Sequence, residues 1–236
     1  MYNEVRTVQR ALDDLLAALS GHESIAAIQI IIVESNSNDG TRQLVIPYES
    51  HPFCEVILES QPKGKGAAVR QGLTRVAGDT VVIYDADCEY QPSDIPSLLG
   101  PILRGETSFV LGSRHTGGAI RHFEEAQLTA KVMNAAHWVF ASMFNILYGT
   151  RLKDPFTMYK IFRVTAIADL YFEANRFDFD FELVGKLVRN GSYPVELPVF
   201  YSSRHFSDGK KIRKVRDPLT WCRALIKYRY GRLRKK

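Results

Sequence analysis

Apolar and polar positions follow one another in blocks that have the lengths of strands and helices. Val8, Leu12, Leu15 and Leu19 recur at helical spacing and predict a helix over Thr7–Leu19. The continuous apolar run Ala27–Val33 is typical of a buried strand. The same patterns predict strands over 55–58, 80–84, 109–111, 159–162 and 195–201, and helices over 64–76, 92–103, 124–148, 181–188 and from 217 onward. This alternation predicts an α/β fold with a mixed, mostly parallel sheet flanked by helices.

Polar clusters follow three of the predicted strands. They are Glu34–Asp39, Asp85–Glu89 and Ser113-Arg114. Because sheets of this type bind ligands beyond the carboxyl ends of their strands, we expect these clusters to form a site.

Asp85 and Asp87 flank one alanine directly after the strand predicted over 80–84. Positions i and i+2 of a strand point to the same side, so the two carboxylates form a hard oxygen site suited to Mg²⁺ or Mn²⁺. Glu89 is a further candidate ligand or a nearby base. The alternative is a solvated acidic turn.

Basic and acidic residues elsewhere supply further candidates. Arg114, Arg204 and Lys210, with Lys211, occupy loop-like settings and would neutralise a diphosphate, or are surface cations. Asp180 and Glu182 alternate with aromatic residues, which predicts catalytic carboxylates or, alternatively, acids in the first turn of a helix. Asp154, before Pro155, is a further catalytic candidate or a turn residue.

The chain has 236 residues, 45% hydrophobic and 24% charged, which is typical of a folded globular protein. Its net charge of +5 is uneven, since residues 209–236 carry +11 and residues 1–208 carry −6. We therefore divide the chain into a catalytic domain over 1–208 and a basic, helical arm over 209–236 that is part of the same domain. The arm favours an anionic partner, or is a solvated helix face. Three widely spaced cysteines predict reduced thiols and no cysteine zinc site.

A series of motifs runs through nearly the whole chain: YNE at Tyr2–Glu4, VESNSNDGT at Val33–Thr41, GKGAAVRQGL at Gly64–Leu73, YDADCEYQPSDIPSLL at Tyr84–Leu99, LGSR at Leu111–Arg114, DPFTMYKIFR at Asp154–Arg163, FDFDFEL at Phe177–Leu183 and VELPVFYSSRHFSDGKKIR at Val195–Arg213. In this order and spacing the chain resembles the family 2 glycosyltransferases of the GT-A fold. Within them it is similar to the dolichol-phosphate mannose synthases and bacterial polyprenyl-phosphate sugar transferases.

The resemblance implies roles for particular residues. A nucleotide base and ribose would be held by Tyr2, Glu4, Val33 and Glu34. The ribose and the metal-bound diphosphate would be held by Asp85, Ala86 and Asp87, with Glu89 as a further ligand of Mg²⁺ or Mn²⁺. Donor or acceptor phosphates would contact Arg114, Arg204 and Lys210, and Asp180 and Glu182 would lie near the acceptor.

Two departures from the family pattern stand out. The family's DDGSxDGT segment is replaced here by Glu34–Thr41, which leaves the base preference open. The family also has an apolar strand ending in proline before YNE, whereas this chain starts at Met1. We expect the sheet to lack that first strand, through a start assigned to an internal methionine or a chain cut there.

The predicted reaction is metal-dependent, inverting transfer of a sugar from a GDP- or UDP-linked donor to a polyprenyl phosphate or a glycan. The predicted setting is the cytoplasm, with peripheral attachment to an anionic membrane surface as a further expectation. The large apolar residues of the helix predicted over 124–148, such as Phe140 and Phe144, either face that membrane or form core. A sugar-phosphate nucleotidyltransferase and a non-catalytic basic module that binds membrane or nucleic acid are the alternatives. No nucleic-acid motif is present in the sequence.

Overall fold

Six strands form two sheets in the computed structural model, which describes residues 1–115, 127–203 and 216–234. Strands β1 and β2 pair in parallel, and the second sheet has the order β3-β5-β4-β6. In that sheet β5 runs antiparallel to both β3 and β4, whereas β6 runs parallel to β4. The strands are β1 (Ile30–Glu34), β2 (Cys54–Leu58), β3 (Thr80–Ile83), β4 (Phe109–Ser113), β5 (Lys160–Arg163) and β6 (Val195–Pro198).

The longer helices lie close to their predicted positions. The helices are α1 (Val8–Leu19), α2 (Thr41–Val45), α3 (Lys65–Leu73), α4 (Ile95–Leu103), α5 (Gln127–Tyr148), α6 (Val164–Ile167), α7 (Phe179–Arg189) and α8 (Arg216–Tyr230). The short 3-10 helices are η1 (Ile46–Ser50) and η2 (Pro92–Asp94). The predicted α/β fold with a mixed sheet flanked by helices is confirmed.

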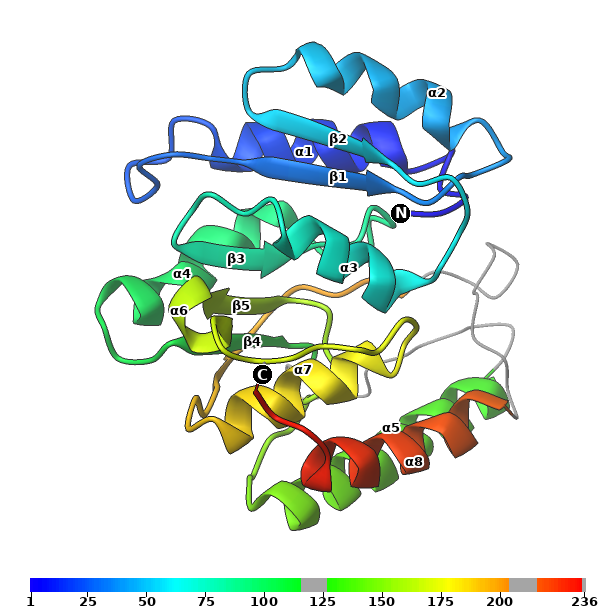
Figure 1. Ribbon diagram of the computed structural model, residues 1–236, viewed down its shortest axis with the longest axis vertical. Coiled ribbons are helices and arrows are strands. Elements are labelled where there is room, and N and C mark those ends of the chain that lie inside the picture. Colours follow the sequence, from blue (N-terminus) through cyan, green and yellow to red (C-terminus); the bar gives the residue numbers. More distant parts are fainter. Residues whose placement is uncertain (116–126, 204–215, 235–236) are drawn as a thin grey trace.

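Helices cover both faces of the strands and one end of the molecule. One core packs α1 and α4 against the strands, with Val8, Ile32, Leu98 and Ile161 among its members. The other is built from residues of α5, α7 and α8 beneath β3, β5 and β4. In Figure 1 the β1-β2 pair lies edge to edge with β3, β5 and β4, and α5 and α8 lie together at the end farthest from β2.

The sheet is interrupted between β1 and β3. These two strands face one another in Figure 1, yet no ladder joins them in the described part of the chain. Met1 lies on the open edge of β1: its α-amino group donates to the carbonyl of Val33 at 2.6 Å, and its carbonyl accepts from the Ser35 amide at 3.0 Å. Because those two bonds are the pattern of a parallel bridge to Glu34, Met1 occupies a strand position.

Candidate functional site

The first residues of the chain lie across the carboxyl ends of β1 and β3. The Asn3 amide donates to Ser37 Oγ at 2.9 Å and the Glu4 amide to Thr41 Oγ1 at 2.8 Å. Thr7 Oγ1 donates to the Ala86 carbonyl at 2.7 Å. These bonds bring Tyr2, Glu4, Val33 and the Asp85–Asp87 segment to one edge of the fold, as the motifs predict.

Glu34 lies at that edge but points inward. Its side chain is fully buried, accepts the amides of Ser37 at 2.7 Å and Asn36 at 3.2 Å, and forms an ion pair with Arg42. Burial alone would raise the pKa of Glu34, but the bonds from Ser37 and Arg42 outweigh it and hold the pKa below its ordinary value. Glu34 therefore braces the loop after β1, and its carboxylate is already committed to protein partners.

Asp85 and Asp87 follow β3 and are half-buried. Asp85 Oδ2 lies 3.0 Å from Lys65 Nζ, and Asp87 Oδ1 accepts the Glu89 amide at 3.1 Å. Burial opposes the charge of Asp85, yet the attraction of Lys65 keeps its pKa below the ordinary value. The Asp85 carboxylate is thus ionised at neutral pH, and both aspartates stand just after the end of β3.

Glu89 does not join those two aspartates in a three-carboxylate cluster. Its Oε2 accepts the Tyr201 hydroxyl at 2.8 Å. Within 1–115, 127–203 and 216–234, no three acidic, histidine or cysteine side chains converge as a metal site. The aspartates alone still fit Mg²⁺ or Mn²⁺, because such ions take one or two carboxylates and complete their shell with water and phosphate oxygens.

Two lysines alternate with two aspartates beside this edge. Lys65 begins α3 and reaches Asp85, while the fully buried Lys160 of β5 lies 2.7 Å from Asp180 Oδ1 in the first turn of α7. Burial lowers the pKa of Lys160 despite Asp180, whereas Asp85, Asp180 and Asp87 together raise the pKa of Lys65 against its burial. The four groups form a charge-balanced cluster that joins β3, β5, α3 and α7.

Arg114 and Asp154 form a bidentate ion pair below the end of β4. Arg114 Nε and a terminal guanidinium nitrogen each lie 2.7 Å from Asp154, and the Arg114 amide donates to the same carboxylate at 3.0 Å. Asp154 is fully buried, and although burial opposes its charge, Arg114 holds its pKa far below the ordinary value. Asp154 therefore orients Arg114, whose guanidinium also lies over the Tyr201 ring at 5.3 Å.

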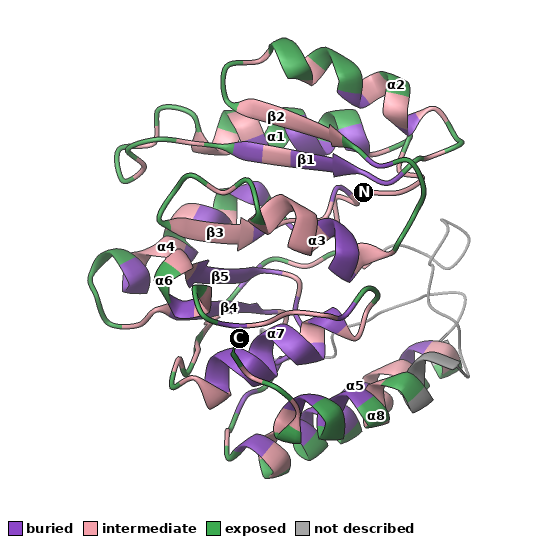
Figure 2. Ribbon diagram, in the orientation of Figure 1, coloured by how far each residue is buried: buried purple, intermediate pink, exposed green. Residues whose placement is uncertain are grey.

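Glu182 points away from Asp180. It is fully buried, accepts the amides of Glu173 and Ala174 and pairs with Lys186 at 2.7 Å. It shapes the loop that precedes α7, a helix that is almost entirely buried (Figure 2). The predicted residues Arg204 and Lys210 lie outside the described residues.

Lys65 and Lys160 are the site residues that sequence reasoning missed. One signal was available for Lys65, because a cation in the first turn of a helix opposes the macrodipole and needs a partner. Lys160 carried no such signal. Its role arises because β5 runs between β3 and β4, which brings it to Asp180 twenty positions later.

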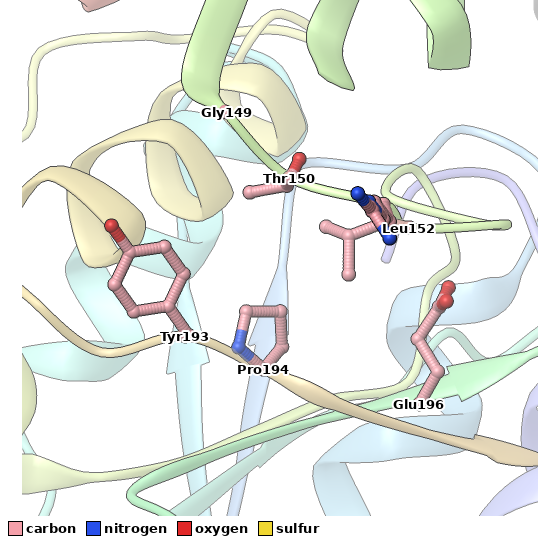
Figure 3. Close-up of a pocket in the computed structure, with 7 residues that line it drawn as sticks. Gly149, Thr150, Leu152, Tyr193, Pro194 and Glu196 are labelled. Atoms are coloured by element: carbon pink, nitrogen blue, oxygen red, sulfur yellow. The ribbon is translucent and has the colours of Figure 1, made fainter. Parts of the chain in front are cut away.

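A hollow of about 350 Å³ opens beside the Arg114–Asp154 pair. Figure 3 shows Leu152, Tyr193, Pro194 and Glu196 around it. Glu196 accepts the amides of Lys153 and Asp154 at 2.7 Å and so supports the segment that carries Asp154. None of the predicted site residues lines this hollow, so we place the site at the carboxyl ends of β1 and β3.

Comparison with known proteins decides the family. The model of glycosyl transferase family 2 matches residues 1–171, which is more than half of the chain. The chain belongs to glycosyl transferase family 2. This family 2 enzyme is therefore a glycosyltransferase, and the resemblance drawn from the sequence is confirmed.

Named relatives span most of this family 2 chain. It is 27% identical to a dolichol-phosphate mannosyltransferase of Mycosarcoma maydis, over 96% of this chain and 76% of that protein. It is 26% identical to a dolichyl-phosphate beta-glucosyltransferase of Saccharomyces cerevisiae, over 95% of this chain and 71% of that protein. An undecaprenyl-phosphate mannosyltransferase of Micrococcus luteus is 24% identical, over 89% and 84%.

A solved structure shares the fold. Glucosyl-3-phosphoglycerate synthase of Mycobacterium tuberculosis superposes with a TM-score of 0.64 at 20% identity, covering 98% of this chain and 78% of that one. That structure holds Mn²⁺, UDP-glucose and phosphoglyceric acid. The likeness confirms the GT-A fold of the family 2 enzyme.

Proposed function

We propose that this family 2 enzyme transfers a sugar from a nucleoside diphosphate sugar to a polyprenyl phosphate at a membrane surface. Relatives named for dolichol or undecaprenyl phosphate support the acceptor class. Structural neighbours in complex with UDP-glucose or GDP-mannose and Mn²⁺ support the donor class. The nucleotide base, the sugar and the choice between Mg²⁺ and Mn²⁺ are to be determined by experiment.

The donor is placed at the carboxyl ends of β1 and β3. Tyr2, Glu4 and Val33 would line the nucleoside, and Asp85, Ala86 and Asp87 the ribose and diphosphate. Asp85 and Asp87 would hold the divalent cation, which supplies positive charge to the departing diphosphate. Lys65, beside Asp85, adds a second cation at the same edge.

The ion pairs formed by the candidate catalytic carboxylates favour one class of acceptor over the other. A sugar hydroxyl must lose a proton as it attacks, and a carboxylate is a useful base only if its pKa lies near the working pH. Here Asp154 is held by Arg114, Asp180 by Lys160 and Glu182 by Lys186. Arg114 holds the pKa of Asp154 far below its ordinary value, and Asp180 and Glu182 each give a carboxylate oxygen to a lysine. A phosphate oxyanion is already a nucleophile and needs no base, so the lipid phosphate is favoured over a glycan hydroxyl.

The proposed attack inverts the anomeric centre. The acceptor oxyanion approaches from the side opposite the diphosphate, and Arg114 or Lys160 would steer its negative charge. Asp180 would position Lys160. A glycan acceptor remains the second candidate, with Asp180 then serving as the base.

Calorimetric titration with UDP and with GDP tests the donor site, each with and without Mn²⁺. The wild type is compared with Asp87→Ala and with Asp79→Ala, a matched control whose exposed side chain precedes the same strand. We expect Mn²⁺-dependent binding of one nucleotide that is lost in Asp87→Ala and kept in Asp79→Ala. Equal binding by all three proteins would contradict the placement of the donor.

A further inference from the structure

The outward face of α5 is largely apolar. Nine described positions of this helix are exposed, and of these only Lys131 and Ser142 carry a charge or a hydroxyl. Leu128 is 77% exposed and Ile146 is 85% exposed. The exposed apolar positions, which we call the α5 stripe, are Leu128, Val132, Ala135, Trp138, Val139, Met143 and Ile146.

The stripe is not part of the hydrophobic core. The opposite face of α5 already forms core, with Phe140, Phe144 and Tyr148 buried, so of the two alternatives for Phe140 and Phe144 the structure shows core. A helix on a protein surface ordinarily presents polar residues to water, and a continuous exposed apolar stripe marks a surface that another phase or molecule covers. Among the described residues, no helix has the length and hydropathy needed to cross a bilayer.

Positive charges surround the stripe. Residues 128–153 and 220–234 contain no aspartate or glutamate. They contribute Lys131, Arg151 and Lys153 around α5, and Arg223 on the exposed side of α8, where Lys227 is exposed as well but pairs with Glu173 at 3.0 Å. Since α5 and α8 pack together at one end of the molecule (Figure 1), this end is both apolar and cationic.

The inner side of α5 reaches the functional site. His137 Nε2 lies 3.1 Å from the Lys153 carbonyl and 3.8 Å from Asp154. The Trp138 ring, which belongs to the stripe, contacts the His115 ring at 4.6 Å between centroids. One helix thus separates the Arg114–Asp154 pair from the outward face.

We propose that the α5 stripe, with the cations of α5 and α8, is the surface on which this enzyme docks to an anionic lipid bilayer. This inference rests on the proposed function, because docking through the α5 stripe would bring the phosphate of a membrane lipid to the Arg114 side of the site. The apolar side chains enter the headgroup region, and the cations contact anionic lipids. The helix lies in the plane of the membrane.

Charge selects the bilayer over a second copy of the chain. A two-fold dimer through the stripe would place this cationic end against itself, and like charges brought together cost binding energy. An anionic surface instead neutralises Lys131 and Arg223. The same charges predict that binding weakens as salt rises.

Vesicle flotation without donor or acceptor tests the surface. The full chain is mixed with phosphatidylcholine vesicles, or with vesicles in which roughly a third of the lipid is phosphatidylglycerol. The test variants are Val132→Glu/Ile146→Glu and Lys131→Glu/Arg223→Glu. The control is Leu103→Glu, which charges an exposed leucine at the end of α4, outside the stripe.

We expect binding to the anionic vesicles, weakened at least about tenfold by either double variant and unchanged by Leu103→Glu. Absence of vesicle binding by the wild type would overturn the proposal, as would unchanged binding by both double variants. So would a dimer in solution that Val132→Glu/Ile146→Glu dissociates, because the stripe would then be a contact between copies. Nucleotide titration of each variant shows whether the protein is folded. It also distinguishes failure of the membrane-docking proposal from failure of the proposed donor site.

Discussion

Two pairs of acids in this enzyme have the same spacing in the sequence but different surroundings in the fold. Asp85 and Asp87 follow β3, and Asp180 and Glu182 begin α7. Both aspartates lie in the segment that follows β3, which ends at Ile83, and this segment stands at the site edge. In a helix, positions i and i+2 lie about 200° apart, so Asp180 faces Lys160 while Glu182 turns inward to Lys186. The spacing of two acids carries no meaning until the element that bears them is known.

The comparison also separates partly exposed carboxylates from buried ones. Asp85 keeps 31% of its side-chain surface exposed, whereas Glu182 keeps none. A partly exposed pair of carboxylates suits a metal and diphosphate, and a buried ion pair suits the fixing of a loop. The following changes should break or sharpen this contrast.

Asp85→Ala should have the largest effect on sugar transfer. It removes a proposed metal ligand and leaves Lys65 without its partner, so we expect at least about a hundredfold loss of sugar transfer. Turnover with saturating donor and Mn²⁺ measures the loss, with Asp79→Ala as the matched control. Transfer within a few-fold of wild type would show that β3 does not present the donor.

Glu182→Gln should unfold the enzyme more readily while sparing its chemistry. The change leaves Lys186 charged and buried beside a neutral amide, which costs about 3–5 kcal/mol of unfolding free energy. Urea unfolding gives this value, and nucleotide titration at low temperature reports the site. A variant of normal stability that fails to transfer sugar would move Glu182 from structure to catalysis.

His137 should make the fold sensitive to acid. Burial lowers its pKa to about 4, against 6.5 for an ordinary histidine, although Asp154 opposes the shift. The unfolded chain then binds more protons than the folded one between pH 6.5 and 4. Stability should fall by up to about 3 kcal/mol as pH drops through that window.

Urea unfolding at several pH values compares wild type with His137→Phe, which keeps an aromatic ring beside Trp138 and Phe156. The variant should lose this part of the pH dependence. An identical slope in both proteins would assign the acid sensitivity to other groups.

Lys65→Met should have the smallest effect of the four. The variant keeps the length of the side chain but removes the cation beside Asp85, so we expect about tenfold weaker binding of the nucleoside diphosphate with Mn²⁺. Lys65→Arg should restore most of the affinity. Equal affinities for all three proteins would leave Lys65 as a structural partner of Asp85 alone.

Most of the fold could be predicted because its signals are local. Apolar runs gave the strands within a few residues, and the helical spacing from Val8 to Leu19 gave α1. The position of Asp85 and Asp87 was also predictable, since two acids directly after a strand lie at the carboxyl edge of the sheet. The motifs placed the chain in its family.

The remaining features depend on contacts between distant segments. Glu34 resembles a ligand-binding acid in sequence, but Arg42 in α2 reaches back to it and draws it inward. The Lys160–Asp180 pair exists because β5 runs antiparallel between β3 and β4. The exposure of the α5 stripe depends on which side of the helix meets α7 and α8. None of these contacts leaves a periodic signal in the sequence.

The most direct measurement compares single-turnover transfer by Asp87→Asn and Asp180→Asn, with a polyprenyl phosphate acceptor and saturating donor and Mn²⁺. If the metal and diphosphate at the end of β3 carry the chemistry and the acceptor phosphate needs no base, Asp87→Asn should lose at least about a hundredfold in rate. Asp180→Asn should stay within about tenfold of wild type, with an unchanged pH–rate profile. The reverse order of losses, with the profile of a carboxylate base abolished in Asp180→Asn, would contradict the account.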